Sequence, residues 1–398
     1  MKIFMISYGA AHVNIMSPVY KELIKNKDNS ITYAALTVAP LKLKGTGIEY
    51  VTVSELARML PYYDTVKMLG RKYGLLHHNN NFEIPEEDTI AYYGIGMHDL
   101  IEEYGITEAE ERFALMERKA FLPVRTMKEL LKRINPDVCV ITDSPRMEKA
   151  TGIAACELHI PVVRVNNTPT CEPVVHTCAL CVMNEWAKSY AVSVENVPEK
   201  DIYITGQPAF DSDFLIEKSY VDEIKDRCGG NHFSKVVTFF AENGVDQSKE
   251  LNALFEIARA MKDVLFVVKL HPNQPLEIYG NPQLENMYFT NEDPKPYFHF
   301  SDLVITTFST TGLESSLFGI PVIVINFDGR KYLLDYIDLG IAVLCDKAED
   351  LREMIQIYLD KDSEAYTALK ESQGKFQFVR NAAQNICNVI KEAVKKAS

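Results

Sequence analysis

Long apolar runs and positive charge are both scarce in this sequence of 398 residues. No run reaches the roughly 20 apolar residues that a membrane-spanning helix needs. Lysine and arginine number 42 against 55 aspartate and glutamate residues, so the formal net charge is −13. Because nucleic-acid-binding proteins need a basic face, this charge argues against that class. It also disfavours docking on an anionic membrane through overall charge, although a local basic patch would still allow peripheral contact.

Several well-known motifs are absent as well. The sequence contains no GxxxxGK(S/T) phosphate loop, no strand-linked GxGxxG, and neither HExxH nor GxSxG. These absences argue against P-loop kinases and ATPases and against nicotinamide enzymes. The N-terminal run MKIFMISYGAAH leads directly into a predicted strand without a separate cleavage site. We therefore expect no signal peptide and a cytoplasmic protein.

Most of the eight cysteines lie inside apolar segments, where we expect them to be reduced and buried. One run, CEPVVHTCALC, places Cys171, His176, Cys178 and Cys181 within eleven residues. The last two cysteines have the spacing of a zinc knuckle, which leaves a metal site open as an alternative. No second CxxC pair follows, and ALCVMNEWA is typical of a buried strand. We therefore expect packing rather than a metal at this run.

Short apolar runs alternate with amphipathic helical stretches, a pattern that predicts parallel sheets crossed by helices. The run ITGQPAFDSDF indicates a junction between two α/β domains. We expect an N-terminal Rossmann-like domain over residues 1–212, a second over 213–375 and a final amphipathic helix over 376–398. A helical insertion is expected at about 62–130, where it would form a lid or a dimer surface.

Polar residues follow the predicted strands, and ligands of open α/β sheets bind beyond the carboxyl ends of strands. The residues in question are Gly9, His12, Asp143, Glu242, Asn243 and His271. Gly9 allows a tight turn, and a carboxylate at Asp143 or Glu242 is suited to proton abstraction. A lone histidine at a strand end is often structural, but His271 lies next to Pro272 and precedes a second polar strand end.

That second strand end is the hydroxyl turn Ser309, Thr310 and Thr311 in the run TTFSTTGLE. A helix start offers unpaired N–H groups and a positive dipole end, so this turn is a candidate phosphate site. Glu314 follows about one helical turn later, where its carboxylate can accept hydrogen bonds from both ribose hydroxyls. The alternative for Glu314 is a surface carboxylate that stabilises the helix start. Together with His271, the turn favours a nucleotide-sugar diphosphate.

The order of these motifs resembles the GT-B superfamily, and within it the UDP-N-acetylglucosamine 2-epimerases. The resemblance rests on GAAHVNIMSPVYKELIK, NPDVCVITDSP, EKDIYITGQPAFD, KLHPN and TTFSTTGLESSLFGIPVIV. It implies two Rossmann-like domains that face a cleft, with the helical insertion in the N-terminal domain. It further implies that the second domain binds the nucleotide sugar, that the first binds the acceptor, and that the last helix returns to the first domain.

Departures from the epimerase pattern favour a different activity. Phe240 and Ala241 replace part of a histidine–arginine run, and Ser309 and Thr310 replace a double-glycine phosphate turn. Acidic residues that epimerisation needs are also missing after RVNN. The sequence looks more like bacterial surface-polysaccharide transferases, which include sialyl-type and Kdo-type enzymes and the glycerophosphotransferases of teichoic acid synthesis.

We therefore expect a glycosyltransferase that uses a UDP- or CMP-linked sugar. The alternatives are a hydrolysing or non-hydrolysing epimerase, a glycerophosphotransferase-like enzyme and a non-catalytic nucleotide-sugar binder. In the transferase hypothesis Asp143 or Glu242 deprotonates the acceptor, a glycan or lipid-linked hydroxyl. His271 and the hydroxyl turn stabilise the leaving phosphate, while Gly9, His12, Asn243 and Glu314 help to bind the donor. No metal or other cofactor is expected, and a homodimer through the insertion is plausible.

Overall fold

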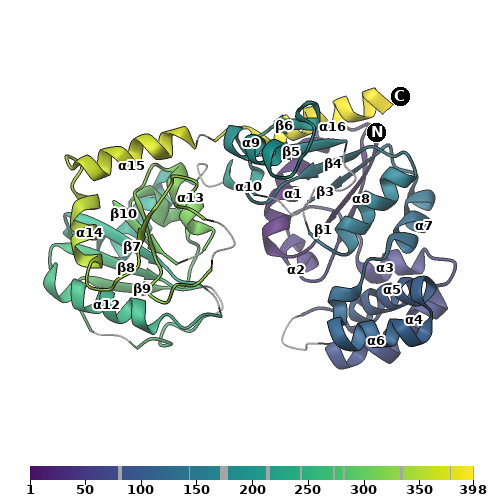
Figure 1. Ribbon diagram of the computed structural model, residues 1–398, viewed down its shortest axis with the longest axis horizontal. Coiled ribbons are helices and arrows are strands. Elements are labelled where there is room, and N and C mark those ends of the chain that lie inside the picture. The colour runs from purple at the N-terminus through teal and green to yellow at the C-terminus, as the bar shows by residue number, and fades with distance from the viewer. Residues whose placement is uncertain are drawn as a thin grey trace. The chain divides into compact units, whose positions relative to one another are not determined.

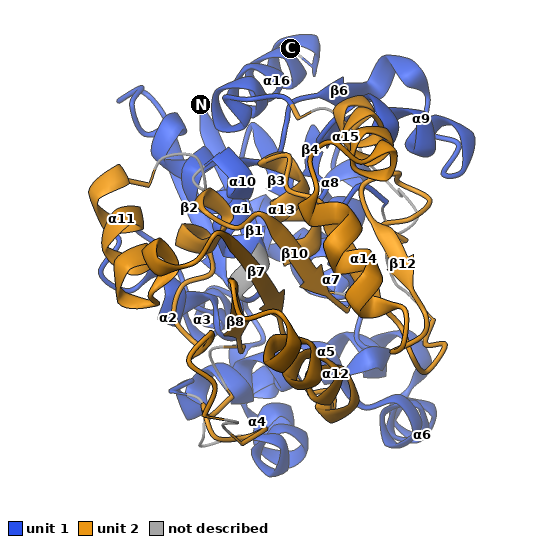
Figure 2. Cartoon of the chain, turned by 90° about the vertical axis from the view of Figure 1, so that its left-hand side faces the viewer, with its two compact units in different colours: residues 1–211, 379–398 blue, residues 212–378 orange. Residues whose placement is uncertain are grey.

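The computed structural model describes most of the chain as two compact units. The described residues are 1–78, 83–142, 144–170, 178–211, 216–242, 244–271, 274–280, 283–307, 309–331, 335–376 and 378–397. Unit 1 consists of residues 1–211 together with 379–398, and unit 2 consists of residues 212–378 (Figure 2). In the described part of the chain, no helix is both long and apolar enough to cross a membrane.

The described strands of unit 1 form a six-stranded parallel sheet in the order β2-β1-β3-β4-β5-β6. The strands are β1 (Lys2–Ser7), β2 (Ser30–Ala35), β3 (Val138–Ile141), β4 (Val162–Val165), β5 (Ala179–Val182) and β6 (Ile202–Ile204). Ile3 is in register with Ile31 on one neighbour and Val138 on the other. Helices cover both faces of such a sheet, which explains why its central strands are nearly continuous apolar runs.

Helices of unit 1 surround this sheet, and those between residues 53 and 116 gather in a group of their own beside it (Figure 1). The helices of unit 1 are α1 (Ala10–Leu23), α2 (Ala39–Leu43), α3 (Val53–Arg58), α4 (Tyr63–Gly74), α5 (Glu86–Tyr104), α6 (Ile106–Met116), α7 (Val124–Ile134), α8 (Met147–Glu157), α9 (Glu185–Ser193), α10 (Pro208–Asp211) and α16 (Ala382–Ala397), with short 3₁₀ helices η1 (Leu75–His77), η2 (Glu117–Ala120) and η3 (Glu199–Asp201). Side chains alternate along β1, so Phe4 and Ile6 join the core shared with α3–α8. Ile3 and Met5 join the opposite core with α1 and α16.

The C-terminal helix α16 belongs to the core of unit 1. Its side chains Ile386 and Ile390 are fully buried in the core that α1 also lines. The Asp211 carboxylate accepts a hydrogen bond from the N–H of Ala382 at 2.6 Å, at the start of the helix. These contacts hold α16 against the unit 1 sheet, which also contains β1.

Unit 2 repeats the parallel arrangement, with described strands in the order β12-β11-β10-β7-β8-β9. Its strands are β7 (Lys235–Phe240), β8 (Val264–Lys269), β9 (Met287–Thr290), β10 (Leu303–Thr306), β11 (Val322–Ile325) and β12 (Val343–Cys345). Its helices are α11 (Lys218–Arg227), α12 (Ser248–Ala260), α13 (Thr311–Leu317), α14 (Leu351–Leu359) and α15 (Glu364–Lys375), with η5 (Gly230–His232) and η6 (Lys295–His299). The prediction of an α/β protein with two Rossmann-like sheets is confirmed.

Helices α4 and α5 cross at unusually short range, and glycines make this approach possible. A Cβ atom added to Gly70 would lie 1.9 Å from the carbonyl oxygen of Ile90. A Cβ atom added to Gly94 would lie 2.0 Å from the carbonyl oxygen of Val66. Both distances are far shorter than van der Waals contact, so neither glycine can become alanine without separating the two helices.

We expect Gly94→Ala to destabilise the protein by about 1–3 kcal/mol, the usual cost of overpacking a core. Urea unfolding of the variant and the parent protein measures this difference. Gly374→Ala is the control, because its added Cβ would contact nothing within 4 Å. Alanine has the better helix propensity, so the control should be neutral or more stable by up to about 1 kcal/mol. Equal stability of Gly94→Ala and the parent protein would contradict the close crossing.

Candidate active site

A buried carboxylate, Glu148, organises the carboxyl end of the unit 1 sheet. It lies in the first turn of α8 with none of its surface exposed. One oxygen accepts a hydrogen bond from the N–H of Tyr8 at 2.8 Å. The other accepts from the N–H of Thr142 at 3.0 Å and from its hydroxyl. Because Tyr8 and Thr142 directly follow β1 and β3, the backbone of two neighbouring strands stabilises this buried charge.

His12, on α1, faces the same carboxylate. Its Nδ1 lies 3.1 Å from Glu148 Oε1 and 2.5 Å from the hydroxyl oxygen of Thr142. The Thr142 hydroxyl donates to Glu148, so both oxygens near Nδ1 are acceptors and Nδ1 carries the hydrogen. In the neutral imidazole with this tautomer, Nε2 carries the lone pair, which is the arrangement that a general base requires. The carboxylate would also stabilise the imidazolium that forms when Nε2 takes a proton.

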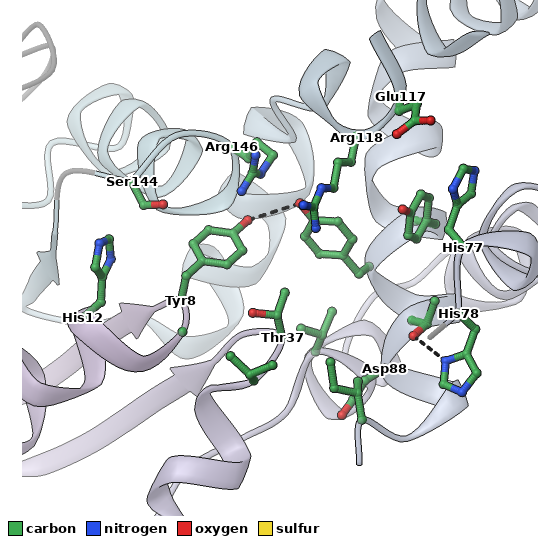
Figure 3. Close-up of a pocket in the computed structure, with 17 residues that line it drawn as sticks. Tyr8, His12, Thr37, His77, His78, Asp88, Glu117, Arg118, Ser144 and Arg146 are labelled. Atoms are coloured by element: carbon green, nitrogen blue, oxygen red, sulfur yellow. Dashed lines mark hydrogen bonds between the residues drawn. The ribbon is translucent and has the colours of Figure 1, made fainter. Parts of the chain in front are cut away.

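A cavity of about 730 Å³ opens beside His12 within unit 1. Figure 3 shows its labelled side chains, which come from the chain after β1 and β2, from α1 and α5, from η1 with the residue after it, from η2, and from the loop before α8. Gly9 lines it with a φ of 25°, in the left-handed region that favours glycine. The structure therefore brings Gly9, in the turn after β1, and His12, in the helix that follows, to the same cavity. Glu148, which completes this site, was not among the predicted residues.

Some predicted residues lie outside the described part of the chain. They are Asp143, Asn243, Cys171 and His176. Of the cysteine run, Cys181 lies on β5, where burial raises the pKa of its thiol to about 12. The Cys178 sulfur donates a hydrogen bond to the carbonyl oxygen of Val162 at 2.9 Å. These two cysteines are free thiols in the described structure.

In unit 2, amides join the ends of β7, β8 and β10. The Thr307 hydroxyl donates to Glu242 at 3.0 Å and accepts from the side-chain amide of Gln247 at 3.0 Å. Gln274 accepts from the N–H of His271 at 2.9 Å and donates to the carbonyl oxygen of Glu242 at 3.4 Å. This network holds Glu242 and His271, both predicted site residues, at neighbouring strand ends.

The environment of His271 favours its neutral form. Burial lowers the pKa of His271 below its usual value, and the charge of Lys269 lowers it further. A neutral imidazole still offers one N–H donor, which suffices for a hydrogen bond to a phosphate oxygen. His271 is therefore suited to binding and polarising a phosphate rather than to carrying a permanent positive charge.

The hydroxyl turn connects β10 to α13, as its sequence indicated. The Ser309 hydroxyl oxygen accepts a hydrogen bond from the Thr311 hydroxyl at 2.9 Å. Tyr336 donates from its own hydroxyl to the carbonyl oxygen of Ser309 at 2.7 Å. Burial raises the pKa of Tyr336, and the charges of Glu314 and Glu242 add to the effect. Tyr336 thus lies near both predicted carboxylates, although no sequence motif identified it.

Lys269 is a second residue that the sequence analysis missed. It ends β8 two residues before His271, and its side chain is buried. Its ammonium donates to the carbonyl oxygen of Leu270 at 2.6 Å. Burial lowers the pKa of Lys269 from 10.5 to about 8, against the opposing charges of Asp293 and Glu292. A cation therefore lies beneath the unit 2 strand ends at neutral pH.

Solved structures with a similar arrangement of two sheets identify the fold. The UDP-GlcNAc 2-epimerase from Neisseria meningitidis bound to UDP-GlcNAc is 15% identical, with a TM-score of 0.61 and full coverage of both chains. A putative UDP-N-acetylglucosamine 2-epimerase from Listeria monocytogenes is 16% identical, with a TM-score of 0.64 and coverage of 99% of this chain and 97% of that one. CalG4, the calicheamicin glycosyltransferase, is 13% identical, with a TM-score of 0.58 and coverage of 100% and 99%. The chain therefore has the GT-B fold that the sequence predicted.

A family model narrows this class. The model described as CDP-Glycerol:Poly(glycerophosphate) glycerophosphotransferase matches residues 163–392, which is more than half of the chain. The chain belongs to that family. Comparison with curated proteins gives no significant match. A transferase family is what the motifs favoured, and glycerophosphotransferase was one of the alternatives that the sequence left open.

The pKa of Lys269 predicts a pH-dependent effect of its removal. At pH 7 the lysine is protonated in both the folded and the unfolded chain, and the folded state bears the cost of the buried charge. Between pH 8 and 10.5 the folded lysine loses its proton while the unfolded one keeps it, so the stability of the parent protein gains from rising pH. We expect Lys269→Met to be more stable than the parent at pH 7 by up to about 3 kcal/mol.

This advantage should shrink as the pH rises from 8 to 10.5. Urea unfolding of both proteins at several pH values measures it, and groups common to both cancel in the difference. The exposed Lys262 provides the control Lys262→Met, for which the difference from the parent should not change with pH. A constant difference for Lys269→Met as well would show that the buried lysine keeps its ordinary pKa.

Proposed function

We propose that the protein is a transferase that moves glycerol phosphate from a CDP-linked donor to an acceptor hydroxyl in surface-polysaccharide synthesis. The observation that carries the proposal is the pairing of His12 with the buried Glu148 at the wall of a cavity. Such a pair has the form of an oriented general base, and the chain belongs to a glycerophosphotransferase family. The proposed acceptor is a glycan or a lipid-linked polymer.

Unit 2 is the proposed donor-binding unit. The backbone and hydroxyl groups of Ser309, Thr310 and Thr311 would bind phosphate oxygens, and the neutral His271 would donate a hydrogen bond to one of them. Glu314 lies in the first turn of α13, where its carboxylate would accept from the ribose hydroxyls. Glu242, fixed by Thr307, would position this set. These roles follow from residue chemistry at the strand ends, where open α/β sheets bind ligands.

The proposed reaction is a displacement at phosphorus. The acceptor oxygen forms a bond to the phosphorus of the glycerol phosphate group, while the bond from that phosphorus to the bridging oxygen of CMP breaks. The acceptor proton passes to Nε2 of His12, and CMP leaves with the electron pair. His271 and the hydroxyl turn stabilise the charge on the leaving phosphate. We propose that no metal or other cofactor is required, so turnover should survive excess chelator.

Sugar transfer from a UDP- or CMP-linked donor uses the same residues but a different electrophile. In that reaction the acceptor attacks the anomeric carbon of the sugar, and a nucleotide leaves. The epimerase alternative instead predicts that a nucleotide sugar is converted without any acceptor. A panel that contains CDP-glycerol, UDP-GlcNAc and a CMP-linked sugar, each with and without acceptor, therefore separates the three reactions.

We expect one donor of this panel to raise the melting temperature. A donor at 100 times its dissociation constant stabilises the folded state by about 2.7 kcal/mol. The double variant Ser309→Ala/Glu314→Ala should lose this stabilisation, because it lacks the proposed phosphate and ribose contacts. A melting shift that the double variant retains would place the donor elsewhere, and no shift from any donor would contradict the proposed function.

His12→Asn should lower turnover by about 10²–10⁴, the usual contribution of a general base. Glu148→Gln should also lower turnover, because an amide cannot accept from all of the surrounding donors. Donor-induced stabilisation should survive in His12→Asn, since the proposed donor site lies in unit 2. The exposed His232 on η5 provides the control His232→Asn, which should keep full activity. Unchanged turnover of His12→Asn would refute its role as the base.

A further inference from the structure

The cavity of unit 1 contains two arginine side chains for which the described part of the chain offers no carboxylate partner. Arg146 and Arg118 both line the cavity, and neither forms an ion pair among the residues that the structure describes. Figure 3 shows the Arg146 guanidinium above Tyr8 and the Arg118 side chain beside it, extending toward the same space. Cations that face a cavity without a protein counterion are suited to an anionic ligand.

Arg146 is held in place by unusual backbone geometry. It is the residue before α8 and has a φ of 67°, a left-handed conformation that costs energy for a side chain of this size. Its guanidinium carbon lies 5.2 Å from the centre of the Tyr8 ring. Its Nε atom is buried and has no hydrogen-bond partner in the described structure. A buried donor without a partner is costly, and a bound anion would satisfy it.

Among the described residues, the two carboxylates that line the cavity, Asp88 and Glu117, form no ion pair with these arginines. Asp88 is buried, and its Oδ1 accepts from the N–H of Ser54 at 2.9 Å, at the start of α3. Glu117 is exposed, and in the view of Figure 3 its carboxylate lies away from Arg146. Asp88 therefore binds the start of α3, and Glu117 faces solvent. The positive charge of the two arginines remains available to a ligand.

Aromatic side chains form much of the remaining wall. His77 stacks on Tyr93 with ring centres 5.0 Å apart and an angle of 8° between the rings. The hydroxyls of Tyr8 and Tyr92 lie 3.5 Å apart and add polar atoms below the arginines. Aromatic faces with a few convergent polar groups are typical of small-ligand sites, and 730 Å³ is an ordinary volume for one. The aromatic faces would pack against the C–H groups of a saccharide or polyol.

We propose that this cavity binds the acceptor through an anionic group, a phosphate or a carboxylate carried on a saccharide or polyol, with Arg146 as the main anchor and Arg118 as the second. The inference rests on the proposed function, because His12 lines the same cavity and would take the proton of the bound acceptor. It extends that function by naming the chemical class of the acceptor and the residues that would bind it, Arg146 just before α8 and Arg118 on η2. A neutral acceptor would leave both guanidiniums unused.

Binding of acceptor analogues without donor tests this inference separately from turnover. We would titrate the full chain calorimetrically with a glycerol phosphate trimer, a glucuronate-containing tetrasaccharide and a neutral disaccharide. At least one anionic probe should bind, and the neutral disaccharide should not. Binding of the phosphate probe alone, or of the carboxylate probe alone, would identify the anionic group. No binding of either anionic probe, or equal binding of the neutral one, would overturn the proposal.

Arginine variants then locate the probe. Arg146→Gln should weaken binding about 10- to 100-fold, as expected for a lost charge-assisted hydrogen bond. Arg146→Lys should restore part of the affinity, and Arg118→Gln should have a smaller effect because Arg118 is exposed. The control is Arg133→Gln on α7, since Arg133 pairs with Glu129 and does not line the cavity. Unchanged affinity of Arg146→Gln/Arg118→Gln would overturn the proposal.

The folding of each variant can be checked independently of the acceptor. Donor-induced stabilisation arises in unit 2, so it should be the same in the arginine variants and the parent protein. If the donor stabilises the protein but neither anionic probe binds, the acceptor proposal fails while the donor site stands. If the anionic probes bind with the predicted dependence on Arg146 and no donor stabilises the protein, the proposed function fails while the anion site stands.

Discussion

The unit 1 site depends on how the protein stabilises a single negative charge. A carboxylate removed from water costs several kcal/mol unless other groups solvate it. Glu148 receives that solvation from the N–H groups of Tyr8 and Thr142, so the charge and the two strand ends hold each other in position. The same carboxylate fixes the orientation of His12. The sheet, the start of α8 and the imidazole thus share one electrostatic constraint.

The strand ends of unit 2 are built differently. Neutral groups, the amides of Gln247 and Gln274 and the hydroxyl of Thr307, connect the loops there. Amides accept and donate at once, so they join backbone and side chains without adding charge. The cation of this region, Lys269, is buried beneath the surface. Unit 1 therefore orients an imidazole with a buried carboxylate, whereas unit 2 presents polar side chains over a buried positive charge.

The fold was largely predictable from the sequence. Strands that are buried on both faces consist of nearly continuous apolar residues, as in the run that forms β3. The positions of the polar residues that directly follow those runs, at the ends of the strands, were predictable for the same reason. Glu148 was not, because a glutamate in a first helical turn resembles a surface residue that stabilises the helix. Its burial follows from contacts with Tyr8 and Thr142, which meet only when β1 and β3 become neighbours. The position of Tyr336 and the backbone conformation of Arg146 also depend on tertiary packing, which no local sequence pattern indicates.

The division of unit 1 into two segments of the chain sets an order of events during synthesis. Residues 212–378, the whole of unit 2, leave the ribosome before α16 does. Until then the face of the unit 1 sheet that Ile386 and Ile390 cover remains open. Domains generally fold as units when their chain is complete, so unit 2 can finish first although it begins later. Unit 1, whose synthesis starts first, is thus the last to complete its core, and α16 is the segment that completes it.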